Sequence, residues 1–249
     1  MGSTLFISLI VFVVVFGGAV AGMLLRSVLP EEPLGGDSRD VIKMGLGMIV
    51  TMAALVLGLL VASAKGSYDA QSAELVQECA NVVLLDHLLA HYGPEAKESR
   101  EALSNVVTLF VKRMWAEDPT VLDPASAGAE ILYGKIQALS PKDEAGRLLK
   151  SQAMSMATNL GQTRWLMYEQ SLAAVSMPLI VIVVFWLTVL FLGWGLLAHP
   201  NTTLVVTMLV SALSVSGAIF LILGMYSPYR GLIHISDAPL RAALAHLGQ

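Results

Sequence analysis

Four long segments of this chain contain no Asp, Glu, Lys or Arg, and this feature constrains the fold more than any other. Each segment has about 21–27 residues, and a helix needs about 20 residues to cross the hydrocarbon core of a bilayer. Because lipid offers no hydrogen bonds to the backbone, a charge-free segment of this length is expected to be helical. The sequence therefore predicts four membrane spans, at residues 4–25, 44–64, 172–198 and 202–225.

The composition agrees with a membrane protein and excludes one class of partner. Hydrophobic residues make up 55% of the chain and charged residues 14%, whereas a soluble domain carries about 25% charged residues. The formal net charge is −4, so no basic surface is expected to neutralise the phosphates of a nucleic acid. The lipid bilayer is the partner that the composition predicts.

The charged residues gather mainly in residues 65–170, between the second and third spans. The predicted fold class is all-α, with four transmembrane helices and a cytoplasmic antiparallel helical bundle inserted between spans two and three. The predicted domains are residues 1–64 (spans one and two), 65–170 (insert), 171–226 (spans three and four) and 227–249 (tail with a short amphipathic helix).

The predicted orientation follows from the Lys and Arg residues near the span ends. Four lie on the side of the insert and three on the other side, which favours a cytoplasmic insert with both termini cytoplasmic. The first apolar run is longer than the core of a signal peptide, so we expect it to be retained as a span.

Helical periodicity predicts how the insert is built. The second span is expected to continue as one helix to Tyr92, where Gly93-Pro94 ends it. Further helices are predicted over residues 95–116 and 125–139, and another that starts with Ser140 as its N-cap. Asp237 or Ser236 is expected to cap a last helix in the tail. Two apolar stripes are predicted to pack together: Leu75, Cys79, Val82, Leu85 and Leu89 against Leu149, Ala153, Met156, Leu160, Thr163 and Met167.

Two stretches of the chain resemble a bacterial membrane protein family called bestrophin-like. One runs from Thr51-Met-Ala-Ala-Leu to Lys65-Gly-Ser-Tyr-Asp-Ala-Gln-Ser-Ala-Glu-Leu, and the other contains Ser227-Pro-Tyr-Arg-Gly-Leu-Ile-His-Ile-Ser and Ala238-Pro-Leu-Arg. The resemblance covers most of residues 45–245. The family typically has acidic residues before a Pro-Phe-x-Gly element, whereas this chain has Met225-Tyr226-Ser227 there and Tyr229 in place of Phe.

The resemblance implies an architecture by analogy. Bestrophins proper are pentameric anion channels with four spans and cytoplasmic termini. The chain is accordingly expected to form a homo-oligomer, a pentamer if the analogy holds, in the bacterial inner membrane, and to pass chloride or other small anions without a cofactor. Likeness of fold does not by itself establish an activity.

One face of the second span carries the candidate pore-lining residues. The face is made of small residues, has no acid, and ends in a lysine on each side, so in a ring of subunits it could enrich anions at the mouths of a pore. The same pattern also suits close helix packing with lysines that reach toward the membrane surface, which is the commoner use of such residues. The candidates are Lys43, Gly47, Thr51, Ala54, Gly58, Ala62 and Lys65.

A hydroxyl-bearing face of the fourth span supplies second-choice pore residues, although such residues more often join membrane helices together. These are Thr207, Ser211 and Ser214.

The sequence gives little sign of metal binding, a reactive thiol or enzyme activity. His87 and His91 stand one helical turn apart, a spacing that can hold a metal, but no third ligand is evident. Cys79 lies in an apolar stripe and is expected to be inert core. The motifs of hydrolases, phosphate-binding loops and zinc proteases are missing, so we expect no metal site and no enzyme.

Two hypotheses remain open from the residues. The first is an oligomeric anion channel with span two nearest the pore. The second is a non-conducting, membrane-anchored helical scaffold or sensor whose insert binds a cytoplasmic partner. No ionisable residue lies within a span, which disfavours proton-coupled transport.

Overall fold

The computed structural model describes residues 2–28, 36–115, 127–172, 177–199, 201–229 and 231–247. These ranges are helical with short connections and contain no strand, so the predicted all-α class is confirmed. The helices are α1 (Gly2–Val28), α2 (Gly36–Tyr92), the 3₁₀ turn η2 (Pro94–Ala96), α3 (Lys97–Met114), α4 (Ala127–Gln137), α5 (Glu144–Leu172), α6 (Met177–Leu197), α7 (Thr202–Met225) and α8 (Ala238–His246).

The chain divides into two compact units, and α2 contributes to both. The membrane unit comprises residues 1–67 and 174–226, and the insert unit comprises residues 68–173 and 227–249. Within the described residues four helices are long and apolar enough to cross a membrane: α1, α6, α7 and the part of α2 in the membrane unit. The four predicted spans therefore correspond to four helices of the structure.

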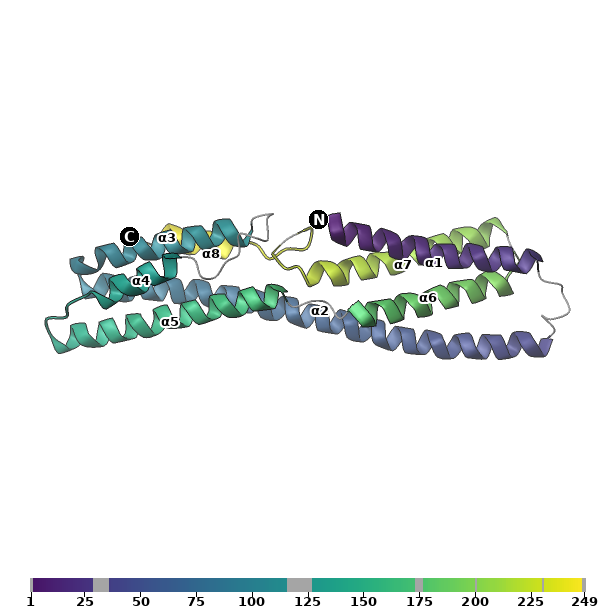
Figure 1. Ribbon diagram of the computed structural model, residues 1–249, viewed down its shortest axis with the longest axis horizontal. Coiled ribbons are helices and arrows are strands. Elements are labelled where there is room, and N and C mark those ends of the chain that lie inside the picture. The colour runs from purple at the N-terminus through teal and green to yellow at the C-terminus, as the bar shows by residue number, and fades with distance from the viewer. Residues whose placement is uncertain are drawn as a thin grey trace. The chain divides into compact units, whose positions relative to one another are not determined.

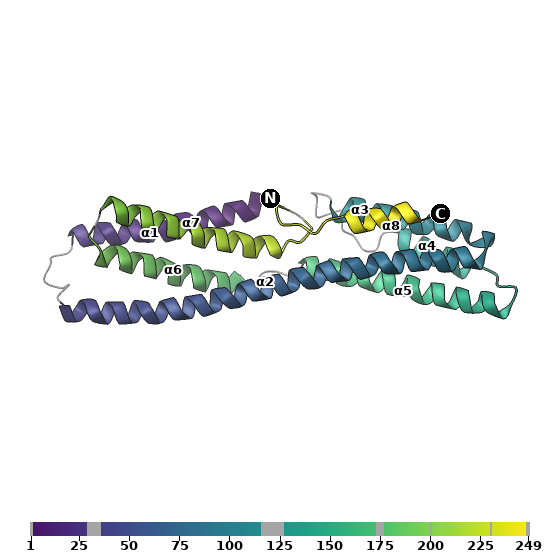
Figure 2. The ribbon, with the colours of Figure 1, turned by 180° about the vertical axis from the view of Figure 1, so that it is seen from behind.

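In the membrane unit, α1 lies alongside both α6 and α7 (Figures 1 and 2). The centre is filled by small and β-branched side chains such as Val15, Val183 and Ala212, which are completely buried. Large apolar side chains cover the outside instead, and Leu55 is 73% exposed. An apolar exterior is the surface that lipid tails can solvate, so this burial pattern suits a bilayer.

Glycines allow α1 and α6 to approach closely. A Cβ at Gly18 would lie 2.9 Å from the carbonyl oxygen of Thr188, and a Cβ at Gly22 would overlap the carbonyl oxygen of Leu192. On the facing helix, a Cβ at Gly195 would overlap the carbonyl oxygen of Ala19. Only glycine fits at these positions without moving backbone, as is usual where membrane helices pack tightly.

In the insert unit, the C-terminal part of α2 packs with α3, α4, α5 and α8 around a separate core (Figures 1 and 2). The two predicted stripes meet there. Leu75, Leu85 and Leu89 of α2 are at most 1% exposed, and Ala153 and Met167 of α5 are buried in the same core. The predicted packing of these two helices is therefore confirmed.

The predicted helix ends are partly confirmed. Gly93 ends α2 as predicted, with a φ of 119° that favours glycine. The predicted N-cap at Ser140 is wrong: α5 starts at Glu144, and Asp143 Oδ1 accepts a hydrogen bond of 2.7 Å from the backbone N–H of Gly146. An acidic side chain beside the positive helix end holds the cap there. The predicted helix ends at residues 116 and 125 lie outside the described residues.

Candidate functional site

The seven candidate pore residues of α2 are all exposed on the single chain. The helix packs on its own chain through another face, where Leu46, Ala53 and Leu60 are at most 7% exposed. Gly193 of α6 makes room for Leu46 at this contact, since a Cβ at Gly193 would lie 2.7 Å from the Leu46 side chain. The structure thus places the whole predicted stripe on a face that α2 does not use within its own chain. Its part in a pore stays a prediction.

The small residues of this stripe have no packing role within the chain. A Cβ added at Gly47 or Gly58 would meet no heavy atom within 4 Å. This differs from Gly18 and Gly22 of α1, where the neighbouring backbone leaves no room. Within the described residues nothing lies against Gly47 and Gly58, which leaves this face open to lipid, water or another copy.

The hydroxyl groups of the candidates bond to their own helices. Thr51 Oγ1 donates to the carbonyl of Gly47 at 2.7 Å, and Thr207 Oγ1 donates to the carbonyl of Thr203 at 2.9 Å. Ser214 Oγ likewise donates to the carbonyl of Val210 at 2.9 Å. These bonds satisfy each hydroxyl within its helix, so an anion would have to compete for the proton. Thr207 and Ser214 are exposed and Ser211 is half-buried.

The two lysines stand at opposite ends of the stripe. They are separated by about 33 Å along the helix, and the hydrocarbon core of a bilayer is about 30 Å thick. This part of α2 is therefore long enough to place a lysine at each surface of a bilayer. Lys43 Nζ forms an exposed ion pair with Asp40 at 3.1 Å, which offsets its charge at that end. Lys65 is exposed at the other end.

Sequence reasoning missed the polar contacts that hold the membrane unit together. Arg26 Nη1 donates to the carbonyls of Leu196 at 3.0 Å and Leu197 at 3.2 Å, at the negative end of α6. Ser216 Oγ of α7 donates to the carbonyl of Ser8 of α1 at 2.6 Å. The only sequence signals are the pair Gly18-x-x-x-Gly22 and the position of Arg26 directly after the first apolar run.

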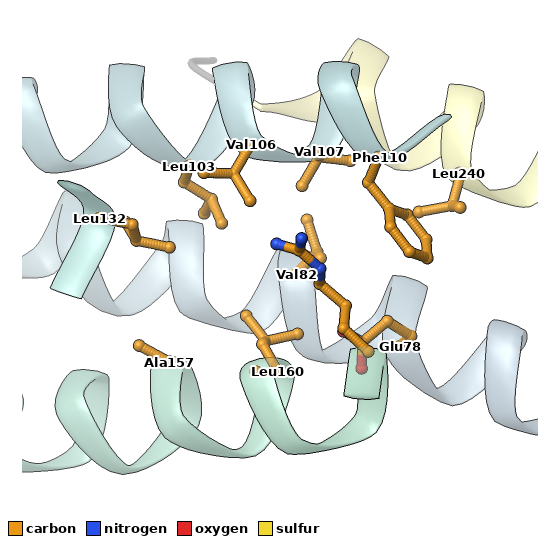
Figure 3. A pocket seen from close by; sticks show the side chains of 12 residues that line it. Glu78, Val82, Leu103, Val106, Val107, Phe110, Leu132, Ala157, Leu160 and Leu240 are labelled. Carbon is orange, nitrogen blue, oxygen red and sulfur yellow. The ribbon is translucent and has the colours of Figure 1, made fainter. Parts of the chain in front are cut away.

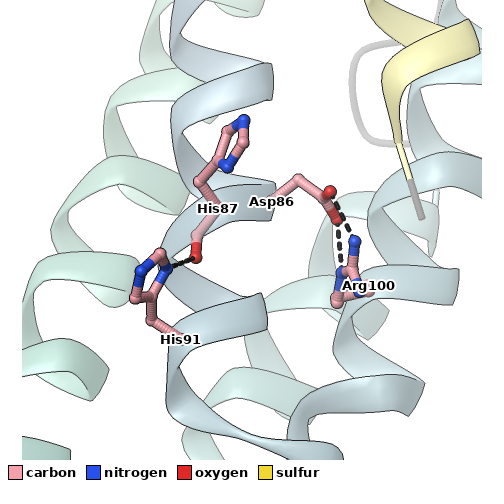
Figure 4. Close-up of polar contacts among 4 residues, drawn as sticks. All are labelled: Asp86, His87, His91 and Arg100. Atoms are coloured by element: carbon pink, nitrogen blue, oxygen red, sulfur yellow. Dashed lines mark hydrogen bonds and ion pairs between the residues drawn. The ribbon is translucent and has the colours of Figure 1, made fainter. Parts of the chain in front are cut away.

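A part-buried ion pair joins α2 and α3 in the insert unit (Figure 4). Arg100 Nε donates to Asp86 Oδ1 at 2.7 Å, and Arg100 Nη2 donates to Asp86 Oδ2 at 2.8 Å. The Asp86 side chain is 6% exposed. This two-bond geometry between guanidinium and carboxylate positions the two helices.

The two histidines and the cysteine that were considered for metal or thiol chemistry also lie on α2. His91 Nδ1 lies 2.9 Å from the carbonyl oxygen of His87 (Figure 4), and both residues are exposed. In the described part of the chain, no three His, Cys, Asp or Glu side chains converge as metal ligands. Cys79 is buried, and burial together with the neighbouring Glu78 raises the pKa of its thiol to about 11. The reactive thiolate is therefore disfavoured.

Comparison with known families decides the class of protein. A family model described as the Bestrophin-like domain matches residues 12–240. The chain belongs to the bestrophin-like family. No curated protein and no solved structure matches it. The resemblance found in the sequence is thus confirmed, and with its four apolar helices this bestrophin-like chain is a multi-pass membrane protein.

The bestrophin-like match begins within α1 and ends within α8, so it includes most of both units. Tyr229 replaces the Phe of the family motif and is 6% exposed. Its ring packs edge-on against the ring of Trp115, with 5.7 Å between the ring centres. Burial raises the pKa of its hydroxyl. Tyr226 lies where acidic residues are typical, and its hydroxyl is 3.1 Å from Ser63 Oγ of α2. Both substitutions therefore have a structural place in this chain.

Proposed function

We propose that this bestrophin-like chain is the subunit of an oligomeric ion channel that passes small anions such as chloride, with α2 nearest the pore. The observation that carries the proposal is the exposed face of α2 from Lys43 to Lys65, which has no acid and which none of the segments that the structure describes covers. A pentamer follows only from the analogy with bestrophins, as do the bacterial inner membrane and cytoplasmic termini.

The charge pattern supports anions over cations. Lysines at the ends of a narrow pathway raise the local concentration of anions, and none of the four predicted spans contains an acid that would attract cations. Under this proposal the insert unit forms a cytoplasmic vestibule, and the protein is a channel and not an enzyme.

The alternative is a non-conducting scaffold or sensor. It is favoured by one observation: the insert unit has a complete core of its own, which a partner-binding domain requires. The two functions differ in a single measurable property, since only the first allows ions to cross a sealed membrane.

The test is chloride flux from liposomes that contain the purified oligomer. Gly58→Trp places a large side chain on the proposed pore face, at an exposed position where an added Cβ meets nothing within 4 Å. We expect it to reduce flux by about tenfold or more. The matched control is Leu59→Trp, at a neighbouring residue that is 63% exposed on a different face, and it should conduct normally.

A charge reversal supplies the second arm. Lys65→Glu should lower the preference for chloride over sodium, whereas Lys65→Arg, which keeps the positive charge, should leave it unchanged. Absence of flux from intact wild-type oligomers would replace the channel by the scaffold. Equal loss in the two Trp variants would remove the assignment of the Gly58 face to the pore.

A further inference from the structure

The core of the insert unit contains a cavity of about 40 Å³ (Figure 3). Val106 and Phe110 of α3 lie on one side and Ala157 and Leu160 of α5 on the other, while α2 closes the back with Val82. A single water needs about 10–15 Å³ in this measure. The cavity therefore has room for about three or four waters, or for one small ligand whose bonded atoms lie closer together than separate waters do.

Two ionisable side chains reach this apolar cavity. Glu78 of α2 is 3% exposed, and its Oε2 atom accepts no hydrogen bond in the described structure. Arg164 of α5 lines the same space, and its guanidinium carbon lies 5.6 Å from the centre of the Phe110 ring. Apolar walls with a few convergent polar groups are the usual form of a small-molecule site.

The charges of the two groups select the ligand. Burial raises the pKa of Glu78 to about 8, and the nearby Arg164 only partly opposes this, so the carboxyl group is mostly protonated at neutral pH. The cavity then presents a cation and a neutral O–H donor. Arg113 adds positive potential beside Arg164. An anionic acceptor suits this pair of donors, whereas a cationic ligand would be repelled.

We propose that this cavity binds a short-chain monocarboxylate, whose carboxylate contacts Arg164 and Glu78 and whose apolar tail fills the space between α3 and α5. The proposal is independent of ion conduction, because it concerns only the insert unit. It gives this unit a ligand that could be sensed from the aqueous side.

Gly161 marks how the ligand enters. It lines the cavity, is exposed, and lies in the interior of α5, where glycine destabilises a helix relative to alanine. A Cβ at this position would meet no heavy atom within 4 Å. The cavity therefore reaches the surface at Gly161, and the missing side chain keeps that path open.

The test measures butyrate binding to the full-length protein in detergent, by ligand-observed NMR and calorimetry through the millimolar range. We expect saturable binding that butylamine does not compete with, and that chloride competes with only weakly. Arg164→Met removes the cation, and Gly161→Leu fills the entrance. Each should weaken binding by about tenfold or more. The matched control is Gly134→Leu, at an exposed glycine of α4 that also has no heavy atom within 4 Å.

Several results would overturn the proposal. No saturable binding, or equal binding in Arg164→Met, Gly161→Leu and the control, would show that the cavity is not a carboxylate site. Chloride competing as strongly as butyrate would show a general anion site without a role for the tail. If Arg164→Met loses helicity, Arg164→Lys replaces it, and unchanged affinity in that variant would remove the guanidinium from the site.

Discussion

At the scale of the residue, Glu78 occupies a position of α2 where helical spacing predicts an apolar side chain. It lies three residues after Leu75 and four before Val82, and all three are buried on the same face. Sequence reasoning found the apolar members of this stripe but passed over Glu78, because a carboxylate is normally assigned to the solvent. The helical spacing places Glu78 on the buried face, and it was passed over only because its side chain is polar.

This burial makes the stability of the insert unit depend on pH. The pKa of Glu78 is raised from 4.5 to about 8, first by burial and with partial opposition from Arg164. Between these two values the unfolded chain has lost the proton while the folded chain keeps it, so stability falls as pH rises from about 4.5 to 8. The slope from this group is at most about 1.4 kcal/mol per pH unit.

Glu78→Gln should remove this dependence, because the amide stays neutral at every pH. Thermal unfolding in detergent across this pH range should show the variant gaining on the wild type as pH rises. The matched control is Glu101→Gln at an exposed position of α3, which should follow the wild-type curve. Parallel curves for Glu78→Gln and wild type would mean that the folded and unfolded states hold the Glu78 proton equally.

At the scale of the element, the close approach of α1 and α6 depends on particular glycines. Gly22→Ala should destabilise the membrane unit by about 1–3 kcal/mol, because the added methyl group meets the backbone carbonyl of Leu192, which cannot turn aside. Gly17→Ala, five residues earlier on the same helix, meets nothing within 4 Å and should be neutral or slightly stabilising. Thermal unfolding of the two variants in detergent measures the difference, and equal midpoints would contradict the tight contact.

Some helix ends could be predicted from the sequence and others could not. The bounds of α7 coincide with the predicted fourth span, because a charged or turn-forming residue stops each end of an apolar run. The start of α5 was missed by a few residues, since Ser140 and Asp143 can both cap a helix and local spacing does not choose between them. Gly22 and Gly47 look alike in the sequence, yet only Gly22 faces another helix. Which glycine is packed depends on partners distant in the chain.

At the scale of the whole molecule, some candidate-site residues could be predicted from the sequence and others could not. Helical periodicity alone places the seven members of the α2 stripe on one face, so they could be named in advance, whereas their exposure is seen only in the structure. The cavity at Glu78 and Arg164 is bounded by five helices, and the Asp86–Arg100 pair joins two. Such groupings arise only when helices meet, and no local pattern encodes them.

The two units have separate cores, and this predicts separate unfolding. No buried residue is common to the two clusters, so loss of one core does not directly open the other. In urea and detergent the insert unit should unfold first. Its core is stabilised by the exclusion of apolar side chains from water, which urea weakens, whereas the spans remain in the micelle. Hydrogen exchange resolved by segment should show α3 losing protection before α6 and α7.

Asp86→Ala tests this separation, because it removes the buried carboxylate that holds the half-buried Arg100 side chain. The insert unit should lose about 1.5–3 kcal/mol, so exchange in α3 should accelerate while exchange in α6 is unchanged. Glu98→Ala is the matched control. It breaks the exposed Lys135–Glu98 pair of the same unit, and an exposed pair contributes little. Acceleration of α3 and α6 together in Asp86→Ala would show that the molecule unfolds as one cooperative body, with α2 transmitting the loss of one core to the other.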